Sequence, residues 1–271
     1  MGGVFTAACL QLNSTGVAEE NVANVERLAR QARKLGATLI MTPEVTTLVT
    51  RMTPQVIAAS THAEADDPSV AAFARLAREL EAWLLIGSIP IRVGEAQAAN
   101  RCFLFGPDGA IAASYDKIHM FDVDLPNGER YRESKSFRPG AAATTADLPW
   151  GRLGLSICYD LRFPHLYRAL AKAGADFLTV SAAFTKTTGE AHWHILLRAR
   201  AIETGCFVFA PAQTGIHAGD GRKTYGHSLI IAPWGEVLAD AGQAVGVISA
   251  TIDPAQVAEA RARVPALSHD V

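Results

Sequence analysis

Three residues of this sequence could together perform nucleophilic chemistry, and each comes at the end of an apolar segment. Cys158 follows RLGLSI, Glu44 ends ATLIMTPE, and Lys117 ends AIAASYDK. A cysteine can attack a carbonyl carbon, a carboxylate can take and return a proton, and an ammonium can stabilise developing negative charge. The structural alternatives are a small buried hydrophobe for Cys158 and a buried ion pair for Glu44 and Lys117.

The position of Cys158 favours the nucleophile. The residues YDLRFP that follow it predict a turn ending at Pro164, which is a favoured first helical residue. The thiol would then lie at the carboxyl end of a strand, where α/β proteins bind ligands. We expect the N–H groups of this turn to hold an oxyanion and to lower the pKa of the thiol.

Histidine is the usual base for a cysteine nucleophile, and the sequence offers six candidates in polar turns or helices. Each also has an ordinary solvated or hydrogen-bonded explanation. Two of them in AHWHILL suggest a metal pair, but a spacing of two residues on a helix places them on different faces, so we predict no metal site. The six are His119, His165, His192, His194, His217 and His227.

The order of predicted elements repeats once along the chain. Each half reads β-α-β-α-β-β-β, and a polar, irregular stretch over 120–148 separates the halves as a predicted working loop. Apolar strands buried on both faces predict a four-layer αββα sandwich of two packed mixed sheets with an internal pseudo-twofold repeat, in one domain over 1–271. The predicted strands are 5–12, 37–44, 83–91, 100–105, 110–117, 152–160, 175–183, 206–213, 227–234 and 245–253. The predicted helices are 21–36, 68–82, 165–174, 191–205 and 254–264.

Composition excludes several classes of partner. The 271 residues are 49% hydrophobic with a formal charge of −2, which gives no footprint for nucleic acid or an anionic membrane. The N-terminus lacks the pattern of a secretory signal, and no apolar run reaches the roughly 18 residues of a membrane span, so we expect a cytoplasmic protein. Four cysteines without a CxxC pair predict reduced thiols.

Several motifs of the chain resemble the nitrilase, or carbon–nitrogen hydrolase, superfamily over nearly its full length. They are TPE, YDKIH, ESKSFRPG, ICYDLRFP, AHWHILLRARAIE and YGHSLIIAPWGEV. The resemblance implies an αββα sandwich, a Glu44-Lys117-Cys158 triad, an oxyanion site formed by Lys117 and the Tyr159 N–H, no cofactor and a homodimer. It also implies a second glutamate, Glu133, beside the lysine and the substrate. The alternative for Glu133 is a surface salt bridge with Arg132 or Lys135.

Two longer phrases, FDVDLPNGERYRESKSFRPG and LRARAIETGCFVFAPAQTG, resemble the branch of deaminated glutathione amidases and ω-amidases. That branch implies a metal-free amidase that acts on a small carboxylate-bearing amide through a cysteine thioester and releases ammonia or an amine. Burial would raise the pKa of Glu44 so that it serves as base and acid. A substrate carboxylate needs a cation, and the candidates are Arg138, Arg162 and Lys186, although Arg162 could instead form a structural pair with Asp160 or with a neighbouring chain. Phe184 resembles a pocket-lining position of the family, and its alternative is an ordinary core residue.

Two other functions fit the same residues. One is a sibling enzyme that hydrolyses an N-carbamoyl amine or a nitrile, because the triad is shared and loops shape the pocket. The other is a non-catalytic binding or scaffold protein that retains the fold, although such a protein would be free to lose the triad.

Overall fold

The first sheet of the protein contains the strands predicted for the N-terminal half, in the predicted order. The computed structural model describes residues 2–125 and 128–269. In this sheet the order is β17-β1-β2-β3-β4-β5, with β8 beside β4. The first three strands of the chain run parallel, and β4, β5 and β17 are antiparallel to their neighbours. The bounds are β1 Phe5–Gln11, β2 Leu39–Met41, β3 Trp83–Arg92, β4 Ala98–Phe105, β5 Ile111–Asp116, β8 Phe137–Arg138 and β17 Gly246–Ile252.

The second sheet has the same arrangement. Its order is β16-β15-β12-β11-β10-β9, in which β10, β11 and β12 are parallel and the outer pairs are antiparallel. This matches β1, β2 and β3 followed by β4 and β5, so the repeat predicted from the order of elements is present in three dimensions. The bounds are β9 Thr144–Leu148, β10 Gly151–Leu155, β11 Phe177–Thr179, β12 Phe207–Ala210, β15 Leu229–Ile231 and β16 Val237–Asp240.

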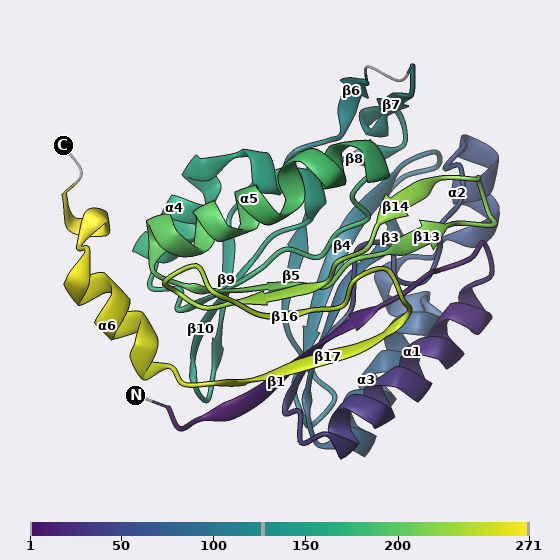
Figure 1. Cartoon of the computed structure of the whole chain (residues 1–271). Coiled ribbons are helices and arrows are strands. Elements are labelled where there is room, and N and C mark those ends of the chain that lie inside the picture. Colours follow the sequence, from purple (N-terminus) through teal and green to yellow (C-terminus); the bar gives the residue numbers. More distant parts are fainter. Residues whose placement is uncertain (1, 126–127, 270–271) are drawn as a thin grey trace.

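Alternating strand residues build two cores. In β1, Cys9 faces the second sheet and Leu10 faces the helices, because successive side chains point to opposite faces of a strand. Helices α1 (Ala18–Lys34) and α3 (Pro68–Leu80) cover the outer face of the first sheet, and α4 (Pro164–Lys172) and α5 (Lys186–Thr204) cover that of the second (Figure 1). The result is the four-layer αββα sandwich.

Short elements that the sequence did not indicate occur in the polar segment between the halves, in other loops and after α6. Helix α2 begins at Pro54, with the Thr53 hydroxyl accepting a hydrogen bond from the Val56 N–H. These elements are α2 Pro54–Ser60, β6 Asp122–Asp124, β7 Arg130–Arg132, β13 Thr214–Ile216, β14 Lys223–Tyr225 and the 3-10 helices η1 Glu64–Asp66, η2 Glu133–Lys135, η3 Cys158–Arg162 and η4 Ala266–Ser268. Helix α6 (Ala255–Arg263) follows β17.

One strand joins a different sheet from the one that the repeat predicts. The strand expected over 245–253 is β17, and it pairs with β1 along seven residues of the first sheet. The last place in the second sheet belongs to β16, which the sequence did not indicate because only Val237 and Leu238 form its apolar run. β17 thus ties the C-terminal half of the chain to the first sheet.

Candidate active site

Glu44 lies three residues beyond the end of β2 and is almost fully buried. Its Oε1 accepts hydrogen bonds from Lys117 Nζ at 2.8 Å and Asn100 Nδ2 at 2.9 Å, and its Oε2 accepts one from the Ala183 N–H at 2.8 Å. Gly87 of β3 lets the chain before Glu44 come close, because a Cβ there would lie 2.2 Å from the Thr42 carbonyl oxygen. Hydrogen bonds to both of its oxygens therefore hold the carboxylate in place.

Lys117 directly follows β5, and its side chain is 2% exposed. Besides Glu44, its ammonium donates to both oxygens of Glu133, at 3.0 and 2.8 Å. Burial favours the neutral amine, but the two carboxylates outweigh it and raise the pKa of Lys117 well above its ordinary value. Lys117 is therefore charged throughout the physiological range.

Glu133 begins the 3-10 helix η2 and faces inward. Its carboxylate also accepts hydrogen bonds from the Phe121 N–H at 2.7 Å and from Asn100 Nδ2 at 3.2 Å. The surface salt bridge considered from the sequence is wrong, since the ion pair that Glu133 forms is with Lys117, and Arg132 pairs with Asp124 at 2.9 Å.

Cys158 begins η3 in the left-handed region, with φ +49°. The Asp160 carboxylate holds this turn by accepting hydrogen bonds from the Ile157 N–H at 2.9 Å and the Tyr115 hydroxyl at 2.7 Å. The Cys158 N–H donates to the Ser181 carbonyl oxygen at 2.9 Å. Because that N–H is engaged, the next one along the chain, at Tyr159, is the candidate donor to an oxyanion.

Both pKa directions expected from the sequence for Glu44 and Cys158 are wrong. Burial and the neighbouring Glu44 carboxylate raise the pKa of the Cys158 thiol well above its ordinary value and outweigh the lowering by Lys117. Burial also acts to raise the pKa of Glu44, but Lys117, the Cys158 thiol and the Ala183 N–H together lower it. The resting site therefore holds a carboxylate, an ammonium and a neutral thiol.

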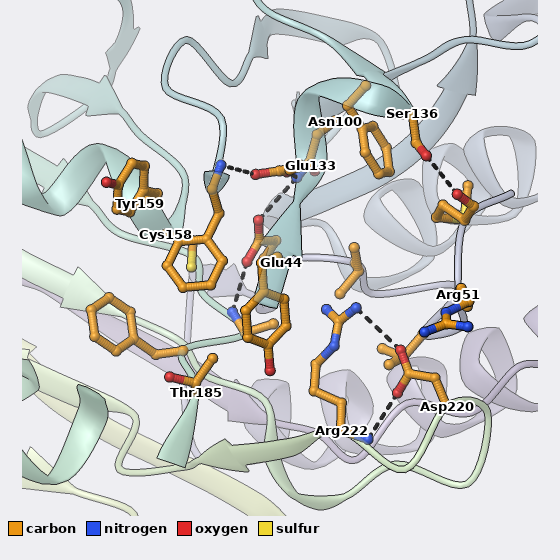
Figure 2. Close-up of a pocket in the computed structure, with 18 of the residues that line it drawn as sticks. Glu44, Arg51, Asn100, Glu133, Ser136, Cys158, Tyr159, Thr185, Asp220 and Arg222 are labelled. Carbon is orange, nitrogen blue, oxygen red and sulfur yellow. Dashed lines mark hydrogen bonds and ion pairs between the residues drawn. The ribbon is translucent and has the colours of Figure 1, made fainter. Parts of the chain in front are cut away.

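A cavity of about 510 Å³ opens over these groups (Figure 2). Glu44, Lys117, Glu133, Cys158 and Tyr159 all line it. Phe184 also lines it, and its contact with substrate stays a prediction. The structure therefore brings together the reactive residues inferred from three distant parts of the chain.

Three predicted substrate-binding cations lie outside the lining of this cavity. Arg162 lies behind the wall, with its guanidinium carbon 5.2 Å from the centre of the Phe184 ring. Lys186 is exposed and 3.9 Å from Glu190, and Arg138 is exposed on β8. The cations that line the cavity besides Lys117 are Arg51, Arg130, Arg132, Arg222 and Lys223.

No histidine is found among the described residues that line the cavity, so none of the six candidates adjoins the thiol as a base. Elsewhere, His194, His227 and Asp240 form a group whose potential metal-ligating atoms lie within 4.8 Å of one another. Each imidazole already hydrogen-bonds to the carboxylate, at 3.2 Å for His194 and 3.0 Å for His227. This group does not adjoin the cavity.

Sequence reasoning missed Asn100 and Asp160. Asn100 donates to both buried glutamates, and Asp160 holds the nucleophile turn. A polar amide at the start of the apolar run NRCFLF was the available signal for Asn100. Sequence reasoning also missed Arg222, which lines the cavity, because nothing in the turn AGDGRK distinguished it from a surface arginine.

Comparison with known proteins agrees with this fold. The Carbon-nitrogen hydrolase family matches residues 6–262. The chain is 41% identical over 266 residues to a deaminated glutathione amidase of Yersinia enterocolitica, covering 97% of this chain and 92% of that protein. It is 36% identical over 267 residues to human omega-amidase NIT2, covering 96% and 93%.

Solved structures of similar proteins have the same fold. The Caenorhabditis elegans NitFhit protein superposes with a TM-score of 0.90 at 34% identity, covering 99% of this chain and 65% of that longer one. An amidase from Nesterenkonia sp. superposes with a TM-score of 0.81 at 26% identity, covering 98% and 96%. The fold and site define a hydrolase of carbon–nitrogen bonds other than peptide bonds. The chain belongs to the carbon–nitrogen hydrolase family.

Proposed function

We propose that this protein is a metal-free amidase in which Cys158 forms a thioester with the acyl part of a small carboxylate-bearing amide. The observation that carries the proposal is that the Glu44 carboxylate, the Lys117 ammonium and the Cys158 thiol share one cavity, with Lys117 Nζ 2.8 Å from Glu44. A thiol with a raised pKa needs a base at the moment of attack, and Glu44 is the neighbouring carboxylate.

The chemistry divides among these groups as follows. Cys158 Sγ attacks the carbonyl carbon while Glu44 takes the thiol proton, and Glu44 then delivers that proton to the departing nitrogen. Lys117 and the Tyr159 N–H stabilise the oxyanion, which is worth about 3 kcal/mol for one such donor. Water next enters the vacated position, Glu44 takes its proton, and the carboxylic acid leaves as the thiol is restored. Glu133 orients Lys117.

For the substrate we propose an amide of the deaminated glutathione or 2-oxoglutaramate type, whose hydrolysis releases an amine or ammonia. The names of the relatives from Yersinia enterocolitica and human support this choice. The cations that line the cavity also suit a carboxylate. Phe184 contributes an apolar wall, and Arg162 packs behind it. Hydrolysis of an N-carbamoyl amine or a nitrile is the second candidate, because the same three groups could serve it.

The test is product release from four substrate classes. We expect ammonia from 2-oxoglutaramate or amine from deaminated glutathione, and little turnover of N-carbamoyl amino acids or nitriles. Cys158→Ala is expected to abolish hydrolysis. If this variant keeps full activity the thioester mechanism is wrong, and if the unmodified protein hydrolyses no oxo amide the substrate assignment is wrong.

We also propose that the chain, as one domain over 1–271, forms a homodimer through the outer face of α5 and the neighbouring second sheet. Five large apolar side chains are exposed there: Ile195, Ile202, Trp234, Val237 and Leu238. A contiguous exposed apolar surface is typical of an interface. Sedimentation of Ile195→Glu should then show monomers.

No helix among residues 2–125 and 128–269 has the length and apolar character needed to cross a bilayer. The cytoplasmic location stays a prediction of the sequence.

A further inference from the structure

The two ends of the cavity differ in charge. The inner end holds two carboxylates, Glu44 and Glu133, with Lys117 between them. The remaining charged residues of the lining, which we call the outer wall, are five cations and two carboxylates: Arg51, Arg130, Arg132, Arg222, Lys223, Glu129 and Asp220. A substrate carboxylate is therefore repelled at the inner end and attracted by the outer wall.

Arg222 differs from the other cations of the outer wall because it is partly buried and is also held by a neighbouring carboxylate. The Arg222 guanidinium lies 3.1 Å from Asp220 Oδ2, and the backbone N–H of Arg222 donates to Asp220 Oδ1 at 2.9 Å. The guanidinium carbon is 6.0 Å from the centre of the Tyr131 ring, and the side chain points into the cavity on the far side of Glu44 from Tyr159 (Figure 2). A guanidinium has five N–H donors, so this pairing leaves donors for a second carboxylate.

The other cations of the outer wall are exposed. The Arg130 side chain is 79% exposed. Arg132 is exposed, and both of its terminal nitrogens already donate, one to the Val123 and Tyr131 carbonyl oxygens and the other to both oxygens of Asp124. Arg51 and Lys223 are also exposed in the chain. An ordered, half-buried guanidinium loses less entropy on binding an anion than a mobile exposed one does. Arg222 is therefore the cation of this wall that is prepared for a ligand.

The hairpin that carries Arg222 is itself anchored. Between β13 and β14, the buried His217 hydrogen-bonds through its ring to the Ser14 carbonyl oxygen and to Thr224 Oγ1, each at 2.8 Å. The backbone N–H of His217 donates to the Arg222 carbonyl oxygen at 2.9 Å. At the tip, Gly219 packs so closely that a Cβ would lie 2.1 Å from the Val49 carbonyl oxygen. The backbone under Arg222 is thus held on two sides.

We propose that Arg222, positioned by Asp220 and Tyr131, is a carboxylate-binding subsite at the outer end of the cavity and determines the specificity of the enzyme for anionic amides. The inference rests on the proposed function and deepens it. The carboxylate belongs either to the acyl part of the substrate or to the departing amine. Both sources make the same bidentate contact with a guanidinium.

The experiment compares Arg222→Met with Arg75→Met, which removes the same charge from an exposed position of α3 outside the cavity lining. The substrates are 2-oxoglutaramate, N-(2-oxoglutaryl)alanylglycine and the C-terminal amide of the latter. Acrylamide, which is neutral, reports the reactivity of Cys158 without a carboxylate. We expect Arg222→Met to lower kcat/KM about 10- to 100-fold, mainly through KM, and to leave alkylation by acrylamide unchanged. Arg75→Met should change either rate less than about threefold.

The substrates for which Arg222→Met lowers kcat/KM show whether the bound carboxylate belongs to the acyl part or to the departing amine. A loss confined to the substrate with a free glycine carboxylate places the subsite on the amine side, and a loss shared by all three places it on the acyl side. An equal fall in alkylation by acrylamide, or no loss with any substrate, overturns the inference.

Failure of the proposed function gives a different result, because the unmodified protein would then hydrolyse none of the three. Protection of Cys158 from acrylamide by 2-oxoglutarate and by alanylglycine still tests the subsite in that case. Weaker protection in Arg222→Met supports the subsite. Equal protection in both proteins, or none in the unmodified protein, refutes it.

Discussion

Replacement of Glu133 by glutamine probes the group that holds Lys117 in place. The carboxylate accepts hydrogen bonds from three donors, namely Lys117 Nζ, Asn100 Nδ2 and the Phe121 N–H. A glutamine has one oxygen and one NH₂ group. In either orientation its NH₂ therefore faces Lys117 and one of the other two donors. Lys117 retains Glu44 as a counter-ion, so no buried charge is left alone.

The magnitude follows from the contacts that are lost. A hydrogen bond to a charged group contributes about 1.5–3 kcal/mol, so Glu133→Gln should lower kcat/KM for 2-oxoglutaramate about 10- to 150-fold. A donor left without an acceptor in the interior costs roughly 1–3 kcal/mol, which should appear in the free energy of unfolding by urea. Glu95→Gln, in an exposed turn, is the matched control and should change neither quantity.

The reactivity of the thiol should move in the opposite direction. The Glu133 carboxylate contributes to the raised pKa of Cys158, so its removal should shift the pH profile of alkylation by acrylamide toward lower pH. Hydrolysis would then fall while alkylation at a given pH does not. Unchanged hydrolysis and unchanged stability in Glu133→Gln would refute the assignment of Glu133 to orientation of Lys117.

Three further predictions follow from burial, close contact and charge. Acrylamide should label Cys158 alone in the folded protein, as mass spectrometry of the digest can show; early labelling of a core thiol would contradict the burial of Cys9, Cys102 and Cys206. Gly87→Ala should destabilise the protein by about 1–3 kcal/mol, because its Cβ would lie 2.2 Å from a carbonyl oxygen, whereas Gly246→Ala, with open space, should be neutral in urea unfolding. The pKa of Glu44 lies below its ordinary 4.5, so Glu44 contributes stability above pH 4.5, and this stability is lost as the pH falls through the folded pKa. The pKa of Lys117 lies above its ordinary 10.5, so Lys117 contributes stability below pH 10.5, and this stability is lost as the pH rises through the folded pKa. Unfolding of Glu44→Gln between pH 2 and 7 should therefore depend less on pH, and an unchanged acid limb would count against the depressed pKa.

The pattern of apolar residues was sufficient for the architecture but not for every pairing of strands. Alternation in β1 and β2 fixed which residues face the helices and which face the other sheet, because a strand has a period of two. The seven-residue pairing of β17 with β1 could not be read from the chain, since a strand of this kind can join either sheet. Helix α5 begins at Lys186 because the Thr185 hydroxyl accepts a hydrogen bond from the Thr188 N–H, five residues before the predicted start.

For the site, the sequence by itself predicted the candidate groups, a carboxylate, an ammonium and a thiol, each at the end of an apolar segment. In the structure Glu44 and Lys117 follow strands of the first sheet, and Cys158 follows β10 of the second. Only the tertiary structure decided their protonation, because the pKa of Glu44 depends on the balance between burial and an ammonium 2.8 Å away. It also decided which arginines reach the cavity. Arg222 lines it and Arg138 does not, and such a contact depends on how distant loops pack rather than on the residues beside each arginine.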